Sequence, residues 1–163
     1  MFGSAKPLPP EKRERCIDYV RAIFGLAARQ DVAASAYNTA VVKAGAAVSG
    51  DLLAASAELL HVAIELERTQ IGLPPVPEEA ASVYLAWQQT WLDYRAWCEI
   101  QAAVLAAGEG VTSTAVTENR RLLDAAERSR RQAEKLEGQL LKRIRPDAAM
   151  LQDWMKSLYK DEQ

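Results

Sequence analysis

Glu58 and His61 are the residue pair whose types and spacing come closest to known metal chemistry. Di-iron helical bundles use the Glu-x-x-His spacing to place two metal ligands on one helical face, and they need this motif on two helices. His61 is the only histidine of the 163 residues, so a second copy of the motif does not exist. On a helical wheel the pair lies with Glu65 opposite the leucine-rich face, toward solvent. We therefore interpret it as an exposed polar face rather than a transition-metal site, and we expect no metal and no cofactor.

Glu67 occupies a position where a carboxylate is costly. Together with Gln70 it falls within the apolar arc of the same helix. A buried carboxylate needs a charged partner or a proton, and Arg95 and Arg29 are the candidate partners. Three interpretations stay open: a buried polar contact, an anchor for a ligand, or a side chain that reaches water near the helix end.

Aromatic residues gather in the segment 87–97, which contains three of the four tryptophans. On a helical wheel these residues share one broad face, with one tyrosine at its edge: Trp87, Trp91, Tyr94, Trp97 and, at the edge, Tyr84. A second apolar face lies nearly opposite and contains Leu85, Leu92, Ala96, Ile100 and Ala103. A helix that is apolar on two faces either lies at the centre of the molecule or meets another chain.

The aromatic face has three interpretations: the core of a bundle, an interface with another subunit, or a small-molecule pocket. Arg95 lies in a narrow polar strip beside it, where it can pair with Glu99. The aromatic residues, Arg95 and Glu67 are the candidate ligand- or partner-binding residues. A homodimer is the expected assembly, with a different protein partner as the alternative.

Residues 112–145 contain nine basic residues, of which five are candidates for contact with a polyanion: Arg120, Arg121, Arg128, Arg130 and Arg131. Five acidic residues are interleaved with the bases, and Glu127 and Arg131 have the i,i+4 spacing of a helical ion pair. Nucleic-acid binding needs uncompensated positive charge on one face. We therefore interpret this segment as a solvated surface. The alternatives are a site for nucleic acid or another polyanion, and a site for an acidic protein surface.

Five helices are expected to position these residues, because prolines and glycines interrupt the helical patterns at a few places. They span residues 10–48, 52–71, 77–107, 113–145 and 147–160, after a flexible segment 1–9. Residues 10–48 form one helix or two collinear ones. Asp51 is the expected N-cap of the second helix, and Thr112 or Ser113 of the fourth. Short connections favour antiparallel neighbours, so we predict one domain, residues 1–163: an antiparallel (up-down-up-down) four-helix bundle with a short C-terminal amphipathic helix.

The last predicted helix carries an apolar stripe made of Leu151, Trp154, Met155 and Leu158. A helix of this length is not stable alone, so the stripe must dock on another surface. Its own bundle is the first candidate, and a groove on a protein partner is the second. A membrane surface is disfavoured, because the few bases of this helix are offset by acids.

The overall composition favours a cytoplasmic protein. No apolar run approaches the roughly 20 residues of a membrane span, and the first residues lack a signal-peptide pattern. Cys16 and Cys98 fit neither a zinc spacing nor a disulfide framework, which indicates free thiols in a reducing compartment. The net charge of −2 favours no particular partner.

The chain contains no phosphate loop, no Gly-x-Ser-x-Gly and no zinc motif, which argues against an enzyme and supplies no catalytic residue. We predict a non-enzymatic helical-bundle protein that acts by self-association or by binding a protein partner. The first alternative is a small-molecule-binding bundle, with or without enzymatic activity, whose aromatic pocket lies on the third helix. The second is polyanion or nucleic-acid binding through the basic fourth helix.

Overall fold

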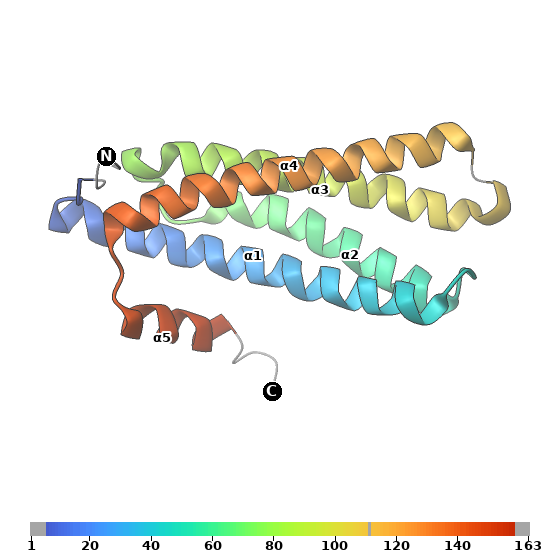
Figure 1. Ribbon diagram of the computed structural model, residues 1–163, viewed down its shortest axis with the longest axis horizontal. Coiled ribbons are helices and arrows are strands. Elements are labelled where there is room, and N and C mark those ends of the chain that lie inside the picture. The colour runs from blue at the N-terminus through green and yellow to red at the C-terminus, as the bar shows by residue number, and fades with distance from the viewer. Residues whose placement is uncertain (1–5, 111, 159–163) are drawn as a thin grey trace, which may run out of the picture.

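A computed structural model describes residues 6–110 and 112–158, and within them every regular element is a helix (Figure 1). Their bounds are α1 (Pro10–Ala44), α2 (Gly50–Thr69), η1 (Gln70–Gly72), η2 (Glu78–Ala80), α3 (Ala81–Ala107), η3 (Gly108–Gly110), α4 (Ser113–Ile144) and α5 (Ala148–Leu158), where η marks a short 3-10 helix. The predicted all-α class is confirmed for these residues. None of the described helices is both long and apolar enough to cross a lipid bilayer.

α1 is a single helix of 35 residues, with no break near its middle. It begins at Pro10, whose missing N–H costs nothing in a first helical turn. It ends at Ala44 and not at residue 48 as expected, because Gly45 adopts a φ of 63° that stops the helix. The valine at position 48, which continues the heptad pattern of α1, therefore lies outside the helix.

Side-chain caps fix the starts of α2 and α4. The Ser49 hydroxyl accepts a hydrogen bond from the Leu52 N–H at 3.1 Å, so Ser49 and not Asp51 is the N-cap of α2. Thr112 caps α4 by accepting from the Ala115 N–H, also at 3.1 Å. α4 ends where Arg145 adopts the left-handed conformation directly before Pro146. A left-handed residue commonly ends a helix, and the proline that follows it cannot continue the helix.

The four long helices lie side by side and alternate in direction. In Figure 1 the residue colour advances from left to right along α1 and α3, and from right to left along α2 and α4. α3 packs most extensively against α4 and also against α2, and α2 packs against α1. α1 and α4 touch at few places, so the side of the molecule between them is open.

The core consists of two clusters of buried side chains. Large members of the first are Tyr19, Ile23, Trp87, Trp91 and Ile144. Large members of the second are Tyr37, Leu59, Tyr94 and Trp97. The aromatic face of α3 contributes to both clusters, so this helix joins them.

The segment before α1 is attached to the end of α4, although residues 1–9 are expected to be flexible. Leu8 is buried, and its backbone N–H donates to the Arg143 carbonyl at 3.2 Å. Arg13 Nε donates to the Ile144 carbonyl at 2.7 Å. This correction concerns residues 6–9, because residues 1–5 lie outside the described part of the chain.

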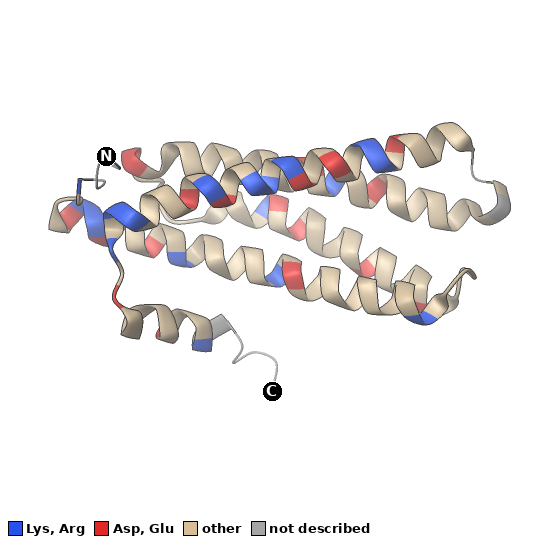
Figure 2. Ribbon diagram, viewed as in Figure 1, with Lys and Arg blue, Asp and Glu red and all other residues tan. Residues whose placement is uncertain are grey.

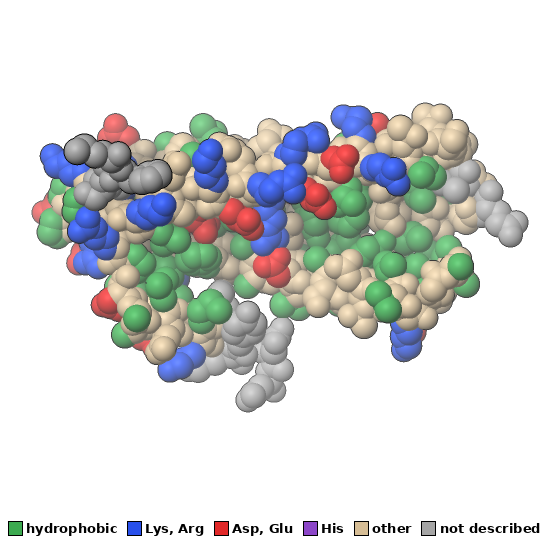
Figure 3. Space-filling model, viewed as in Figure 1, with side chains coloured by type: hydrophobic (Ala, Val, Ile, Leu, Met, Phe, Trp, Pro, Cys, Tyr) green, Lys and Arg blue, Asp and Glu red, His purple; other side chains and the backbone are tan. Residues whose placement is uncertain are grey.

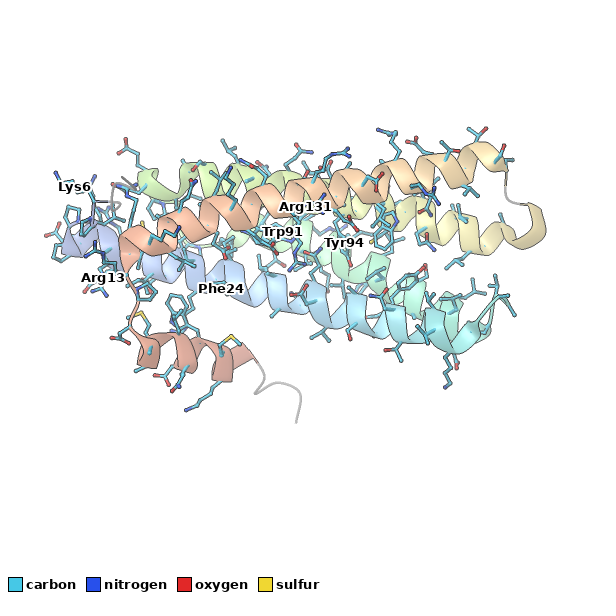
Figure 4. All side chains as sticks on the ribbon, viewed as in Figure 1. Lys6, Arg13, Phe24, Trp91, Tyr94 and Arg131 are labelled. Carbon is cyan, nitrogen blue, oxygen red and sulfur yellow. The ribbon has the colours of Figure 1, made fainter. Side chains whose placement is uncertain are left out.

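α5 docks on α1 through Trp154, one residue of the expected stripe, and not through the stripe as a whole. Trp154 is buried, and its ring centroid lies 5.7 Å from that of Phe24; Figure 4 shows Phe24 between the two helices. Met150 packs against the same cluster. Leu151 and Met155 of the expected stripe are 39% and 55% exposed. The side chain of Leu158, the fourth residue of that stripe, lies outside the described residues.

Candidate functional site

The aromatic face of α3 lies inside the core. The rings of Trp87 and Trp91 are stacked with centroids 5.3 Å apart, and both side chains are fully buried. Tyr94 and Trp97 are buried next to them, and Tyr84 is half-buried at the edge. Figure 4 shows Trp91 and Tyr94 between the long helices. Of the three interpretations of this face, the placement fits the core best.

The opposite face of α3 points outward. Leu85 is 61% exposed and Leu92 is 42% exposed, and they lie seven residues apart on this face. The polar residues beside it are bonded within the chain: Gln89 donates to Asp93 at 2.8 Å, and Ser129 of α4 donates to the same carboxylate. Ala96 and Ile100 of the same face are half-buried, and Ile100 packs against the second core cluster. The part of this face that the described chain leaves uncovered is therefore the part around Leu85 and Leu92.

Glu67 meets Arg95 at the surface between α2 and α3. Arg95 Nη1 donates to Glu67 at 2.5 Å, and Arg95 Nε donates to Glu99 at 3.0 Å. These two hydrogen bonds raise the pKa of Arg95, with that to Glu67 contributing most. The side chains of Glu67 and Arg95 are 24% and 37% exposed, so the network is partly solvated. Arg29, the other candidate partner, instead donates to Glu65 at 2.6 Å.

Glu58 and His61 lie on the exposed side of α2. His61 Nε2 is 3.4 Å from Glu65, and both side chains are more than 40% exposed. Among the described residues, no three histidine, cysteine, aspartate or glutamate side chains are grouped closely enough to hold a metal ion.

Positive and negative residues alternate along α4 (Figure 2). Arg121 makes two hydrogen bonds to Glu118, at 2.7 and 2.5 Å, and Arg131 lies 3.5 Å from Glu127. Arg120 and Arg128 are exposed, and no ion pair within the described residues includes either. Much of the positive charge of this helix is thus compensated locally.

A groove with a volume of about 1350 Å³ follows α1 from Asp18 to Ala36. Its other walls come from α2 and α4, and Trp87 of α3 and Met155 of α5 also line it. Figure 3 shows hydrophobic side chains along the seam between α4 and α1, with charged side chains across its middle. The groove exists because α1 and α4 make few contacts.

Glu137 is a buried carboxylate that lines this groove. It is 6% exposed, and Trp87 Nε1 donates to its Oε2 at 2.8 Å. Burial raises the pKa of Glu137 to about 7, with a further increase from Glu134; the Trp87 hydrogen bond and the charge of Arg130 oppose this. At neutral pH the groove therefore contains a carboxyl group that is partly protonated.

Arg130 crosses the seam from α4 to α1 close to Glu137. Its Nη1 and Nη2 donate to the two oxygens of Asp31 at 2.7 and 3.1 Å, and its Nε donates to Glu134 at 2.7 Å. Its guanidinium carbon lies 5.9 Å from the centroid of the Trp87 ring. Burial disfavours the charge, but the contacts with Asp31 and Glu134 outweigh it and raise the pKa of Arg130.

Neither Glu137 nor its groove is predicted from the sequence, in which Glu137 is one of the acidic residues interleaved with the bases of an exposed helix. One signal was present: Glu137 lies four residues after Ala133 and three before Leu140, and both neighbours belong to the buried seam of α4. Arg130 was identified, but for contact with a polyanion. In the structure its guanidinium group donates hydrogen bonds to the carboxylates of Glu134 and Asp31.

The two thiols are poorly placed for nucleophilic chemistry. Cys16 and Cys98 are free and buried, and burial raises the pKa of both, that of Cys98 to about 12.

The chain was also compared with protein-family models, with curated proteins and with solved structures, and none of the three comparisons gives a match.

Proposed function

We propose that this chain is a non-enzymatic helical-bundle protein that acts by self-association through the outward face of α3, with a different protein partner as the alternative. The observation that carries the proposal is the exposure of Leu85 and Leu92, 61% and 42%, on a helix whose other face is already buried in the core. Apolar side chains at an interface core are the usual source of association energy.

A second copy fits this face because the two leucines can pair symmetrically. They are seven residues apart, about 10 Å along the helix. If two α3 helices cross antiparallel around a two-fold axis near Gln88 and Gln89, Leu85 meets Leu92 of the partner subunit, and the reverse. The apolar area is small, and association has its own entropic cost, so we expect a weak dimer.

Sedimentation velocity at micromolar concentrations tests this proposal. We expect a concentration-dependent dimer, and we expect the double substitution Leu85→Asp and Leu92→Asp to abolish it. Val42→Asp with Ile71→Asp is the matched control, since these side chains are 83% and 80% exposed on other helices. A wild-type protein that stays monomeric, or a control that dissociates the dimer equally, would contradict the proposal.

The same proposal includes the architecture and the compartment. We propose one domain: an antiparallel (up-down-up-down) four-helix bundle of α1 to α4, followed by α5. The alternating directions of the four helices in Figure 1 support it. We further propose a cytoplasmic location, supported by the two buried free thiols Cys16 and Cys98.

Small-molecule binding is a second candidate function, favoured by a specific observation. Trp87 and Glu137 lie together on the lining of the groove beside α1, so an aromatic ring and a buried carboxylate face the same space. Binding of a ligand there would change tryptophan fluorescence and raise the melting temperature. The polyanion hypothesis stays a prediction, and the ion pairs along α4 give it no support.

A further inference from the structure

We propose that the groove beside α1 binds an organic cation, an ammonium group on an apolar or aromatic stem, with Glu137 as its counter-ion. This inference rests on the second candidate function and names its ligand class. It starts from the one carboxylate that lines the groove and is nevertheless buried within the described residues.

The Glu137 carboxylate is only half satisfied. Trp87 Nε1 donates to Oε2, whereas no donor within the described residues bonds to Oε1, which is not one of the fully enclosed polar atoms and so keeps some exposure. A carboxylate that is largely removed from water has lost most of its solvation, so a donor or a cation that reaches its free oxygen stabilises it. An ammonium group in the groove supplies both an N–H donor and a positive charge.

The charges around the groove favour a cation over an anion. Six carboxylate residues line it, against three arginines: Asp18, Asp31, Glu58, Glu65, Glu134 and Glu137, against Arg21, Arg29 and Arg130. Arg130 is engaged by Asp31 and Glu134, and no ion pair within the described residues joins it to Glu137. Asp18, Glu58 and Glu137 form no ion pair within the described residues, and of these three Glu137 alone is buried.

The rest of the lining suits an apolar stem. Beside the Trp87 ring, the groove is lined by Phe24, Leu26 and Ala27 of α1 and by Met155 of α5. Ligand sites combine mostly apolar walls with a few polar groups that orient the ligand. Because Glu137 lies next to Trp87, the ammonium group of the ligand would lie at the floor of the groove and its apolar stem would lie along α1.

Binding should be coupled to the proton of Glu137. The groups that interact with it directly are Arg130 and Glu134 on α4, Tyr19 on α1 and the neutral Trp87 on α3. The other charged and titratable groups that line the groove are Asp18, Arg21, Arg29 and Asp31 on α1, and Glu58, His61 and Glu65 on α2. Burial raises the pKa of Glu137 to about 7 in the free protein, and an adjacent ammonium stabilises the carboxylate. The cation therefore displaces a proton below about pH 7, which weakens its binding there.

A matched pair of probes tests the inference: 2-phenylethylamine, which is charged at neutral pH, and 2-phenylethanol, which is neutral and has nearly the same shape. Binding is followed by the NMR shift of the Trp87 indole N–H in the full chain. We expect the amine to bind at least roughly tenfold more tightly than the alcohol. We also expect its affinity to fall at least roughly tenfold between about pH 8 and about pH 5, while that of the alcohol stays constant.

Glu137→Gln keeps an oxygen that accepts the Trp87 hydrogen bond and removes the charge, so it should remove the preference for the amine. Glu127→Gln, at an exposed position of the same helix, should keep it. Circular dichroism checks that both variants fold, and the pH series on the wild type tests the inference independently of them. Equal binding of both probes, or an unchanged preference in folded Glu137→Gln, would overturn the inference and leave the candidate function standing. Binding of neither probe would overturn both.

Discussion

Glu137 has the least ordinary environment among the described carboxylates. It is 6% exposed, it accepts a hydrogen bond from Trp87, and burial raises its pKa to about 7 from its ordinary value of 4.5. The folded protein therefore holds a proton that the unfolded chain releases between about pH 4.5 and pH 7. The contribution of Glu137 to the free energy of unfolding therefore decreases as the pH rises through this window, because its ionisation is harder in the folded state.

Substitution of this residue should change that dependence. Glu137→Gln does not titrate, so its stability relative to wild type should rise from about pH 4.5 to pH 7 and then level off, with a total gain of about 3 kcal/mol or less. Urea unfolding across a pH series measures it, with Glu127→Gln as the exposed control. A constant difference between Glu137→Gln and wild type would show that Glu137 titrates normally.

At the scale of the elements, the sequence locates helices well and their caps less well. Prolines and glycines mark the ends of α1, α3 and α4 to within a few residues. The N-cap of α2 was assigned to Asp51, two residues after the true cap, Ser49. Both residue types cap helices, and the choice depends on where the chain enters the first turn, which the loop conformation decides.

The cap of α2 gives a paired prediction. Ser49→Ala should lower the free energy of unfolding by about 1 kcal/mol, because the Leu52 N–H loses its acceptor. Asp51→Ala should cost less, since its side chain is 83% exposed and contributes mainly through the helix dipole. Denaturant unfolding of both variants decides it, and a larger loss for Asp51→Ala would contradict the assignment of the cap.

α5 is attached to the bundle mainly by one side chain. Trp154 is 5% exposed and packs against Phe24, whereas Leu151 is 39% exposed and Met155, which lines the groove, is 55% exposed. Trp154→Ala should therefore increase amide hydrogen exchange throughout residues 148–158 and leave α3 protected. Met155→Ala is the matched control, and equal loss of protection in both variants would mean that α5 is held by another contact.

At the scale of the whole molecule, the sequence predicts which residues share a face of a helix, but it does not predict the gap between α1 and α4. The helical wheel of α3 separated Trp87, Trp91, Tyr94 and Trp97 from Leu85 and Leu92, and the first set is buried while the second is exposed. The groove depends on how far α1 lies from α4, which no local pattern encodes. Glu137 was missed for the same reason: its burial depends on Trp87, 50 residues away in the sequence.

The two-faced α3 helix is the centre of this account, and disulfide trapping near the proposed two-fold axis tests it most directly. Cys16 and Cys98 are buried, and position 89 is exposed. A cysteine introduced by Gln89→Cys should therefore be the thiol that is accessible for cross-linking among the described residues. With mild oxidant at micromolar concentration, we predict that Gln89→Cys forms a covalent dimer and that Ala57→Cys, exposed on α2, does not. Equal cross-linking of the two variants, or none with Gln89→Cys, would contradict self-association through this face.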